Sequence, residues 1–228
     1  MPMSSQTLSF RLRIARNRSD LLAACQVRAG SYGRHLPHLR AAFALPDALD
    51  LEPDTAVFLC VDKASNQAIG TARVQTNTRG PLLIEHSVGL PAPMSGDTRV
   101  EITRLAVMPG ADALAKLALM KASYLYCVAA QVRWMVIGSR NEALTRQYRR
   151  LGFADVFDEE RRVDLKHAGH LPHQVLAFNV TSAERCWQAS GHALYDFMID
   201  TAHADISLFS TEPAMQPAEL RQAQAVAA

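Results

Sequence analysis

Short apolar runs and helical repeats alternate along the middle of this chain. Residues 100–107 and 134–138 are mainly apolar, and a proline–glycine turn follows the first run. Short apolar runs bounded by turn residues predict buried β-strands, whereas the apolar spacing within residues 114–125 predicts a helix that faces a core. A second helix is predicted over residues 141–151, because Gly152 is a typical helix end. The predicted order is therefore strand, helix, strand, helix.

The N-terminal half predicts a strand, a helix and a β-hairpin. Residues 8–15 alternate apolar and basic side chains, which is typical of an edge strand with one face in water. Ser19-Asp20 offers an N-cap for a helix that runs to about Gly30. The hairpin is predicted from two apolar strands, residues 57–61 and 68–74.

A long connection, residues 31–55, separates the first helix from the hairpin. It holds short apolar pieces among prolines, which predicts a partly helical loop. A loop of this length inside a compact domain is usually functional or mobile.

The C-terminal part predicts a strand over residues 174–180 and a helix from Ser182 to about Ile199. The segment 211–228 is rich in Ala, Gln and Pro and has no packing pattern, so we expect a disordered tail there. The remainder, residues 1–210, is expected to form a single α/β domain.

Composition excludes several classes of protein. A chain of 228 residues with 49% hydrophobic content can bury one full core, while a net charge of +2 selects no partner. No apolar run reaches the roughly 18 residues of a membrane helix, and the polar start lacks a signal-peptide pattern. We therefore expect a cytoplasmic protein without an integral membrane segment. Aromatic residues make up 7% of the chain and do not interleave with its basic clusters, which argues against a nucleic-acid partner.

Cysteines and histidines do not form a recognisable site. The cysteines lie far apart in apolar contexts and predict buried free thiols: Cys25, Cys60, Cys127 and Cys186. His35-x-x-His38 and His167-x-x-His170-x-x-His173 have spacings that could hold a metal on a helix. Gly169 and Pro172 would break a helix that carries the second set of histidines. No carboxylate or cysteine stands at ligand spacing, so no metal is expected.

The segment from residue 100 to 153 resembles two motifs of the GCN5-related N-acetyltransferase (GNAT) superfamily. Asn141 stands seven residues before Tyr148, which stands four residues before Gly152-Phe153. The resemblance implies a central mixed, mostly antiparallel sheet with a V-shaped splay, flanked by helices. It also implies that the pantetheine arm of an acyl thioester inserts into the splay.

Within the superfamily, the chain is most similar to FeeM-like N-acyl amino acid synthases and acyl-homoserine-lactone (autoinducer) synthases. The similarity covers roughly residues 10–165 and rests on Arg28 in an early helix, Gly70-Thr-Ala-Arg73 at a strand and Glu101-x-x-Arg104 in the next. It implies transfer of an acyl group from a thioester to an amine.

Amide formation from a thioester needs a base for the amine, donors for the oxyanion and an acid for the thiolate. Glu101 is the candidate base, since a carboxylate in a mainly apolar strand is usually paired or functional. A buried ion pair with Arg104 or Arg73 is the alternative. Strict alternation would place Glu101 and Arg104 on opposite faces, so a bulge would be needed to bring them together. Direct attack by the amine ranks above a covalent acyl-cysteine.

The resemblance implies roles for further residues. Tyr148 is the candidate acid, with packing on an amphipathic helix as the alternative. Asn141 could bind the pantetheine chain or merely cap a helix. The guanidinium groups of Arg28, Arg73 and Arg104 could orient a substrate carboxylate if they converge. The oxyanion would face backbone N–H groups of the following donor-binding residues: Leu105, Ala106 and Val107.

The expected phosphate site departs from the pattern of acetyl-CoA enzymes. Those enzymes hold the pyrophosphate on glycines at a helix start, whereas this chain has Asp112 and Ala113 there. Asp112 would repel phosphate and is expected to cap the helix instead. The departure favours an acyl group that arrives on the phosphopantetheine of an acidic acyl carrier protein, with no tightly bound cofactor. The expected docking face is basic, with Lys116 and Lys121 as alternatives to the following arginines: Arg146, Arg149, Arg150, Arg161 and Arg162.

The sequence thus predicts an N-acyltransferase that moves a fatty acyl group from acyl carrier protein to the amine of an amino acid or a related small metabolite. Two alternatives stay open. One is an acetyl-CoA-dependent N-acetyltransferase, and the other is a catalytically silent module that binds an acyl group or carrier protein.

Overall fold

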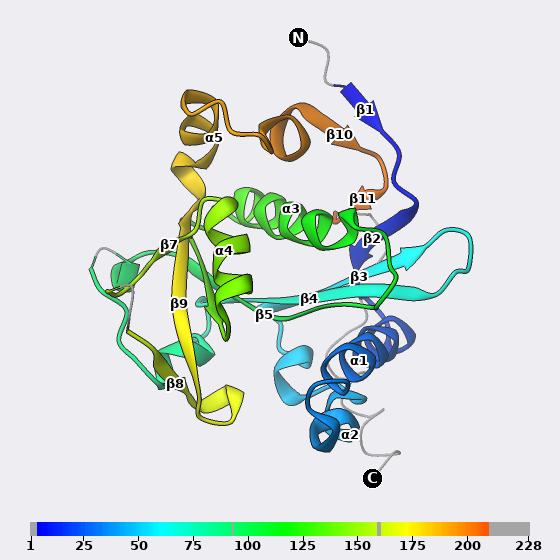
Figure 1. Cartoon of the computed structure of the whole chain (residues 1–228), viewed down its shortest axis with the longest axis horizontal. Coiled ribbons are helices and arrows are strands. Elements are labelled where there is room, and N and C mark those ends of the chain that lie inside the picture. The colour runs from blue at the N-terminus through cyan, green and yellow to red at the C-terminus, as the bar shows by residue number, and fades with distance from the viewer. Residues whose placement is uncertain (1–3, 93, 159–160, 210–228) are drawn as a thin grey trace. The chain divides into compact units, whose positions relative to one another are not determined.

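The chain forms a large mixed β-sheet, mostly antiparallel, with flanking helices (Figure 1). This computed structural model describes residues 4–92, 94–158 and 161–209. The expected disordered tail, residues 211–228, lies outside the described residues. Among those described, no helix is long and apolar enough to cross a membrane.

Residue contacts divide the chain into two compact units, which we name after a candidate residue in each. The Glu101 unit comprises Ser4 with Gln75–Thr103 and Tyr124–Ala202, and the Arg28 unit comprises Ser5–Val74, Arg104–Ser123 and the chain from His203. Several elements run along the chain from one unit into the other: β1 (Ser4–Gln6), β4 (Ala68–Thr76), β5 (Arg99–Val107), α3 (Leu114–Ala129) and β10 (Thr201–His203).

The Arg28 unit begins with a strand and a helix, as the N-terminal sequence predicts. Its remaining elements, in chain order, are β2 (Phe10–Ile14), α1 (Arg18–Tyr32), η1 (Pro37–Leu39), α2 (Arg40–Phe43), η2 (Ala48–Leu51), β3 (Thr55–Asp62) and β11 (Ile206–Ser207). Helix α1 packs on β3 through a cluster of apolar side chains: Leu21, Ala24, Leu51, Val57 and Leu59.

The predicted hairpin is confirmed, because β3 and β4 are neighbours joined by a tight turn in which the Asp62 N–H donates to the Gln67 carbonyl. The prediction that the first strand lies at an edge is wrong. β2 pairs with β3 on one side and with β11, in parallel, on the other. The first helix begins after Asn17, whose side chain caps the Asp20 N–H, and not at Ser19.

The long connection between α1 and β3 is partly helical, as predicted. It contains η1, α2 and η2, each of four residues or fewer. At η2 the Asp47 carboxylate accepts N–H groups of Leu49 and Asp50, and Asp50 accepts the N–H of Asp47 in return. This reciprocal capping box fixes the end of the connection.

The Glu101 unit holds the strand β6 (Trp134–Ser139) between β5 and β9 (Leu171–Asn179). Its other elements are η3 (Leu83–His86), η4 (Met94–Gly96), α4 (Glu142–Arg150), β7 (Ala154–Asp155), β8 (Val163–Leu165), η5 (Lys166–Ala168), α5 (Val180–Ala189) and η6 (Asp196–Asp200). β6 pairs in parallel with β5 and antiparallel with β9, while β7 and β8 pair with β9. The β5–β6 register ends at Ile102 and Ile137, where the expected splay would begin.

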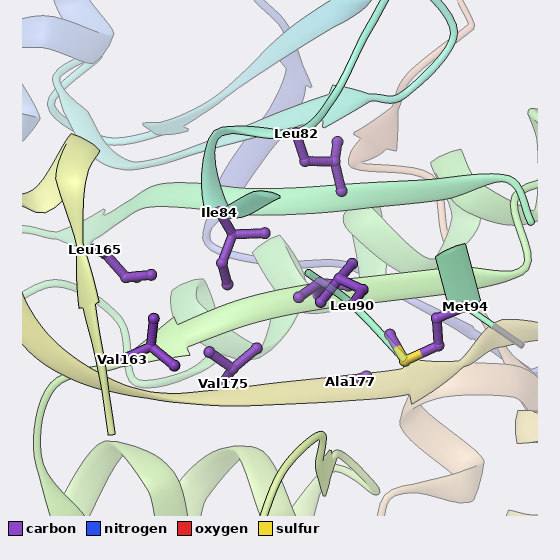
Figure 2. Close-up of a cluster of buried hydrophobic side chains, with 9 residues drawn as sticks. Leu82, Ile84, Leu90, Met94, Val163, Leu165, Val175 and Ala177 are labelled. Atoms are coloured by element: carbon purple, nitrogen blue, oxygen red, sulfur yellow. The ribbon is translucent and has the colours of Figure 1, made fainter. Parts of the chain in front are cut away.

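Two sets of buried side chains stabilise this unit. One is aliphatic, and Figure 2 shows its side chains gathered between the 3-10 turns and the strands: Leu82, Ile84, Leu90, Met94, Val136, Val163, Leu165, Val175 and Ala177. The other is aromatic, with ring centroids 5.2–6.3 Å apart, and contains Tyr124, Tyr148, Phe153, Phe178 and Trp187.

The helix that follows β9 is shorter than predicted. α5 ends at Ala189, and Gly191 has a φ of +57°, so the chain turns there before η6. The apolar residues near 194–198 that suggested one long helix belong to this later turn of the chain. Helix α4, in contrast, agrees with its prediction to within one residue at each end.

Gly152 ends α4 in a conformation that only glycine adopts without strain. Its φ is +98°, and a Cβ atom there would lie 3.2 Å from Phe178 Cε2 and 3.2 Å from Trp187 Nε1. We expect Gly152→Ala to lower the free energy of unfolding by about 2–4 kcal/mol, because backbone strain and overpacking add. Urea unfolding would measure the loss.

Gly191→Ala is the matched control, since Gly191 also has positive φ but a Cβ atom there would meet nothing within 4 Å. It should cost about 1–2 kcal/mol, the strain alone. An equal decrease in the free energy of unfolding for the two variants would mean that the aromatic cluster accommodates the added methyl group without an energetic penalty.

Candidate active site

The three predicted arginines converge within the Arg28 unit on two aspartates of the long connection. Arg28, on α1, donates two hydrogen bonds to Asp50, with N–O distances of 2.7 and 2.9 Å. The pair is buried, with side-chain exposures of 2% and 0%. Forked geometry of this kind gives the strongest arginine–carboxylate contacts. The deepest part of the cluster is thus an ion pair closed to solvent.

Arg73 and Arg104 bind the second aspartate. Arg73 Nη1 lies 2.6 Å from Asp47 Oδ1 and 3.3 Å from Asp50 Oδ1, so it bridges the two carboxylates. Arg104 Nη2 lies 3.3 Å from Asp47 Oδ2. Exposure increases outward along the cluster, because Arg104 is 25% and Asp47 40% exposed. The outer pair is therefore the part that a solute could reach.

Charges in this arginine–aspartate cluster do not cancel. Three guanidinium groups face two carboxylates, which leaves one formal positive charge. Burial, and then the like charge of Arg73, lower the pKa of Arg104. Burial alone would raise the pKa of the Asp47 carboxyl, but Arg73 and Arg104 outweigh it and hold that pKa below its ordinary value. The outermost arginine, Arg104, has one carboxylate contact, of 3.3 Å, whereas Arg28 has two shorter ones.

Two aromatic side chains frame the outer arginine. The guanidinium carbon of Arg104 lies 4.6 Å from the centroid of the Phe43 ring, a cation–π contact. The Phe43 ring lies 5.1 Å from that of Tyr32, whose hydroxyl donates to the Leu105 carbonyl at 2.9 Å. α1, α2 and β5 are therefore linked around Arg104.

Arg104 has an irregular backbone conformation within β5. Its φ is +55°, in the left-handed region that is uncommon for residues other than glycine. Such a residue breaks the alternation of a strand and re-aims its side chain. Glu101 contacts residues of the Glu101 unit, and Arg104 contacts residues of the Arg28 unit.

Glu101 lies in the Glu101 unit on β5 and is almost fully buried, with a side-chain exposure of 1%. Its Oε2 accepts the backbone N–H of Ile84 at 2.8 Å, and its Oε1 lies 3.2 Å from Nε2 of His167. Ile84 belongs to the aliphatic cluster of Figure 2. The carboxylate is therefore held between a peptide donor and an imidazole at the margin of an apolar core.

Tyr148 is buried on α4, and its ring lies 5.8 Å from that of Phe153. Asn141 is the N-cap of the same helix, since its side chain accepts the N–H of Leu144 at 3.0 Å. Thr145 precedes Tyr148 by about one helical turn, and it anchors α4 through hydrogen bonds to Ser139 and Gln174. The fold thus fixes the helix that carries the candidate acid.

The predicted donor-binding backbone lies at the end of β5. Ala106 is buried, whereas Leu105 and Val107 are half-buried. The Leu105 carbonyl already accepts the Tyr32 hydroxyl. The role of these backbone groups toward an oxyanion stays a prediction.

The predicted docking arginines differ in how far their charge is compensated. Arg149 binds Asp155 at 2.7 Å, Arg162 binds Glu142 at 3.0 Å, and Arg161 stacks on Phe157 at 4.3 Å. Arg146 and Arg150 are exposed on α4, and no described acid forms a salt bridge with either. They stand four residues apart, so they share a helix face.

Asp112 caps α3 as predicted. Its Oδ1 accepts the Leu114 N–H at 2.8 Å, and its other oxygen accepts the Ser9 hydroxyl. A carboxylate therefore already occupies the helix N-terminus where acetyl-CoA enzymes hold a pyrophosphate.

The histidine and cysteine sets do not assemble into a centre. Of the described residues, no group of three or more His, Cys, Asp or Glu side chains is arranged to hold a metal. Cys25, Cys60 and Cys127 are buried free thiols, whereas Cys186 is exposed, contrary to the prediction. Burial raises the pKa of Cys25 to about 11, which disfavours a thiolate nucleophile.

Sequence reasoning missed the partners of its candidate residues. Asp47 and Asp50 form a capping-box pattern that could have marked them, but nothing in the sequence assigns arginines to them. Tyr32 and Phe43 carry no motif. His167 was considered only for its spacing to other histidines.

Comparison with known proteins decides the family. The family model of the N-acyl amino acid synthase FeeM matches residues 23–169. The chain belongs to the FeeM family of N-acyl amino acid synthases. It is accordingly an N-acyltransferase, as the sequence predicted. No curated protein matches the chain.

Solved structures share the fold at low identity. FeeM from uncultured soil microbes has a TM-score of 0.61 at 15% identity, covering 83% of this chain and 98% of that one. A CoA-dependent acyl-homoserine lactone synthase, BjaI, solved with SAM and isopentyl-CoA, has a TM-score of 0.55 at 15% identity, covering 94% and 99%. An acyl-CoA N-acyltransferase from Pseudomonas aeruginosa has a TM-score of 0.51 at 16% identity, covering 74% and 97%. The GNAT-like fold is thereby confirmed.

The arginine–aspartate cluster should also stabilise the protein. We expect Arg28→Leu to lower the free energy of unfolding by about 3–5 kcal/mol, because it leaves the buried Asp50 carboxylate uncompensated. Arg104→Gln removes only the outer, partly solvated contact and should cost less than about 1 kcal/mol. Urea unfolding of both variants measures the contrast, and similar losses would contradict the gradient from a closed inner pair to an open outer one.

Proposed function

We propose that this protein transfers a fatty acyl group from the thioester of an acyl carrier protein to the amine of an amino acid or a closely related carboxylated metabolite. The observation that carries the proposal is the partly exposed guanidinium of Arg104, which has a single carboxylate contact of 3.3 Å at the outer end of the cluster. Membership of the FeeM family supports the amide-forming chemistry.

The acceptor argument rests on charge and accessibility. Arg28 is closed to solvent and bound by Asp50 through a fork, whereas Arg104 makes one contact of 3.3 Å with Asp47 and keeps further N–H donors. A substrate carboxylate would supply the missing negative charge and could form forked hydrogen bonds with this guanidinium. Phe43 holds the guanidinium plane and limits its rotation. An amine acceptor that also bears a carboxylate fits this end of the cluster.

Each bond change has a candidate group. Glu101 takes a proton from the acceptor nitrogen, directly or through a water, so that its lone pair can attack the thioester carbonyl. Backbone N–H groups near residues 105–107 stabilise the oxyanion. Collapse of the tetrahedral intermediate breaks the C–S bond, and Tyr148 gives its proton to the departing thiolate. The amide and the free phosphopantetheine thiol are the products.

A carrier protein is the favoured donor because of two charges. Asp112 caps α3 and opposes a pyrophosphate at that helix start. Arg146 and Arg150 form a basic pair that an acidic carrier could contact, while their neighbours Arg149 and Arg162 are already salt-bridged. Acyl-CoA remains the alternative donor, because the solved relative BjaI is CoA-dependent by name.

Glu101→Gln and Arg104→Gln should affect different kinetic constants. We expect Glu101→Gln to lower kcat by roughly 10²-fold or more while acceptor binding survives, since the amide still accepts the Ile84 N–H but takes no proton. Arg104→Gln should instead raise the KM for the acceptor. Steady-state kinetics and calorimetric binding measure both. Binding of a carrier protein without turnover in the wild-type protein would favour the silent module.

The donor is tested with purified protein, acyl carrier proteins and acyl-CoAs of graded chain length, and pooled amino acids, with mass spectrometry for new N-acyl products. We expect long-chain N-acyl amino acids from the carrier protein only. Products from acetyl-CoA at comparable rates would support the acetyltransferase alternative.

The double variant Arg146→Glu/Arg150→Glu separates docking from chemistry. It should raise the KM for acyl carrier protein at least tenfold and leave turnover of a free acyl-pantetheine unchanged, because only the protein donor needs the basic pair. An equal effect on both donors would show that these arginines do not form the docking face.

A further inference from the structure

His167 makes a contact that the proposed reaction does not yet use. The residue lies in the short turn η5, and its Nε2 is 3.2 Å from Oε1 of Glu101. Its side chain is 19% exposed, whereas that of Glu101 is 1% exposed. The imidazole therefore joins a carboxylate inside the Glu101 unit to solvent.

The surrounding structure fixes this contact from both sides. The Lys166 N–H donates to Ser87 Oγ at 2.9 Å, which ties η5 to the end of η3. The Ile84 N–H in η3 holds the other oxygen of Glu101 at 2.8 Å. Leu165 and Ile84 pack in the aliphatic cluster that Figure 2 shows beneath these turns. Neighbouring turns thus hold one oxygen of the carboxylate and place the imidazole beside the other.

We propose that His167 is a positioning residue for the base, whose imidazole lies against the Glu101 carboxylate at 3.2 Å and switches its basicity by its own protonation. The inference rests on the proposed function, in which Glu101 accepts the proton of the amine. With neutral His167, neither the Ile84 N–H nor the imidazole adds a charge beside Glu101.

Protonation of His167 places a positive charge 3.2 Å from Glu101. A neighbouring positive charge favours the ionised carboxylate and so weakens it as a base. Rate therefore falls as the pH drops through the histidine titration. Histidine is the side chain whose ordinary pKa places this change near physiological pH.

Other titratable groups on the elements packed against η5 have their own partners or lie in solvent. Glu85 of η3 binds Arg99 at 2.7 Å, and Nδ1 of His173, on β9, contacts the Leu171 carbonyl at 2.7 Å. The remaining ones are exposed: His86 of η3, Asp164 of β8, Lys166 of η5 itself and His170. Glu101 is thus the acid that faces His167 directly.

The test is the pH profile of kcat/KM for His167→Gln and His167→Ala. Glutamine keeps a polar side chain beside Glu101 but cannot titrate, so the acid limb should move at least one pH unit lower while the plateau stays within about threefold of the wild type. Alanine also removes the side chain that contacts the carboxylate, so kcat on the plateau should fall roughly tenfold or more with KM unchanged. An unshifted acid limb in His167→Gln would overturn the proposal.

His170→Asn is the matched control on the same segment. His170 is exposed and has a φ of +57°, which asparagine tolerates. Its profile should coincide with that of the wild type. A shift of the same size in this variant would assign the effect to general surface charge and overturn the specific role of His167.

Titration of His167 by nuclear magnetic resonance provides a readout that needs no turnover. Glu101→Gln removes the negative charge beside the imidazole, so the titration midpoint of His167 should move at least half a pH unit lower than in the wild type. An unchanged midpoint would refute the coupling. If the midpoint moves but Glu101→Gln retains full turnover, the base assignment fails while the coupling itself stands, so the two failures are distinguishable.

Discussion

Burial of charge on the connection between α1 and β3 is the constraint on which the Arg28 unit depends. Arg28, Asp50 and Arg73 have side-chain exposures of 0–2%. Such charges are tolerated only where partners satisfy them. Asp50 receives forked hydrogen bonds from α1 and caps η2 in return, so the connection cannot leave β4 and α1 without exposing unpaired charge. A segment rich in prolines thereby obtains one defined conformation.

In the arginine–aspartate cluster, the inner ion pairs stabilise the fold, whereas the outer pair can recognise a ligand. The inner contacts are closed, and the outer pair of Arg104 and Asp47 is open to solvent. Two arginines bind the inner carboxylate, so the outer arginine has less negative charge beside it. A binding group for an anion arises here from incomplete neutralisation at the edge of a rigid network. Phe43 and Tyr32 keep that edge ordered although it borders water.

Periodicity and turn residues predicted most helices and strands, because these depend on local patterns. The edge assignment of the first strand was wrong, since the pairing of β11 with β2 joins residues almost 200 positions apart in sequence. The helix after β9 was predicted too long, because the apolar spacing continued across the Gly191 turn. The N-cap differed by two residues, a distance over which several capping side chains compete.

The candidate site was predicted only in part, because its contacts join residues that are far apart in sequence. Arginines in motif positions could be identified, but their convergence depends on Asp47 and Asp50 in a segment without periodicity. The left-handed conformation of Arg104 has no sequence signature, since arginine rarely adopts it. Histidines at three-residue spacing suggested a helical face, whereas Gly169 and His170 both have positive φ and separate the side chains. His167 turns to Glu101 instead, and only the folded chain places them in contact.

Glu101 illustrates why a buried base needs neighbours of a particular kind. Removal of water raises the free energy of the ionised carboxylate, so that an isolated Glu101 would be protonated and inactive as a base. A fixed cation at hydrogen-bond distance would ionise it but also reduce its proton affinity. The Ile84 N–H orients one oxygen without a charge, and the imidazole of His167, 3.2 Å from the other oxygen, adds a charge only when it is protonated. The position of β5 beside η3 and η5 therefore determines how strongly this carboxylate can act on an amine.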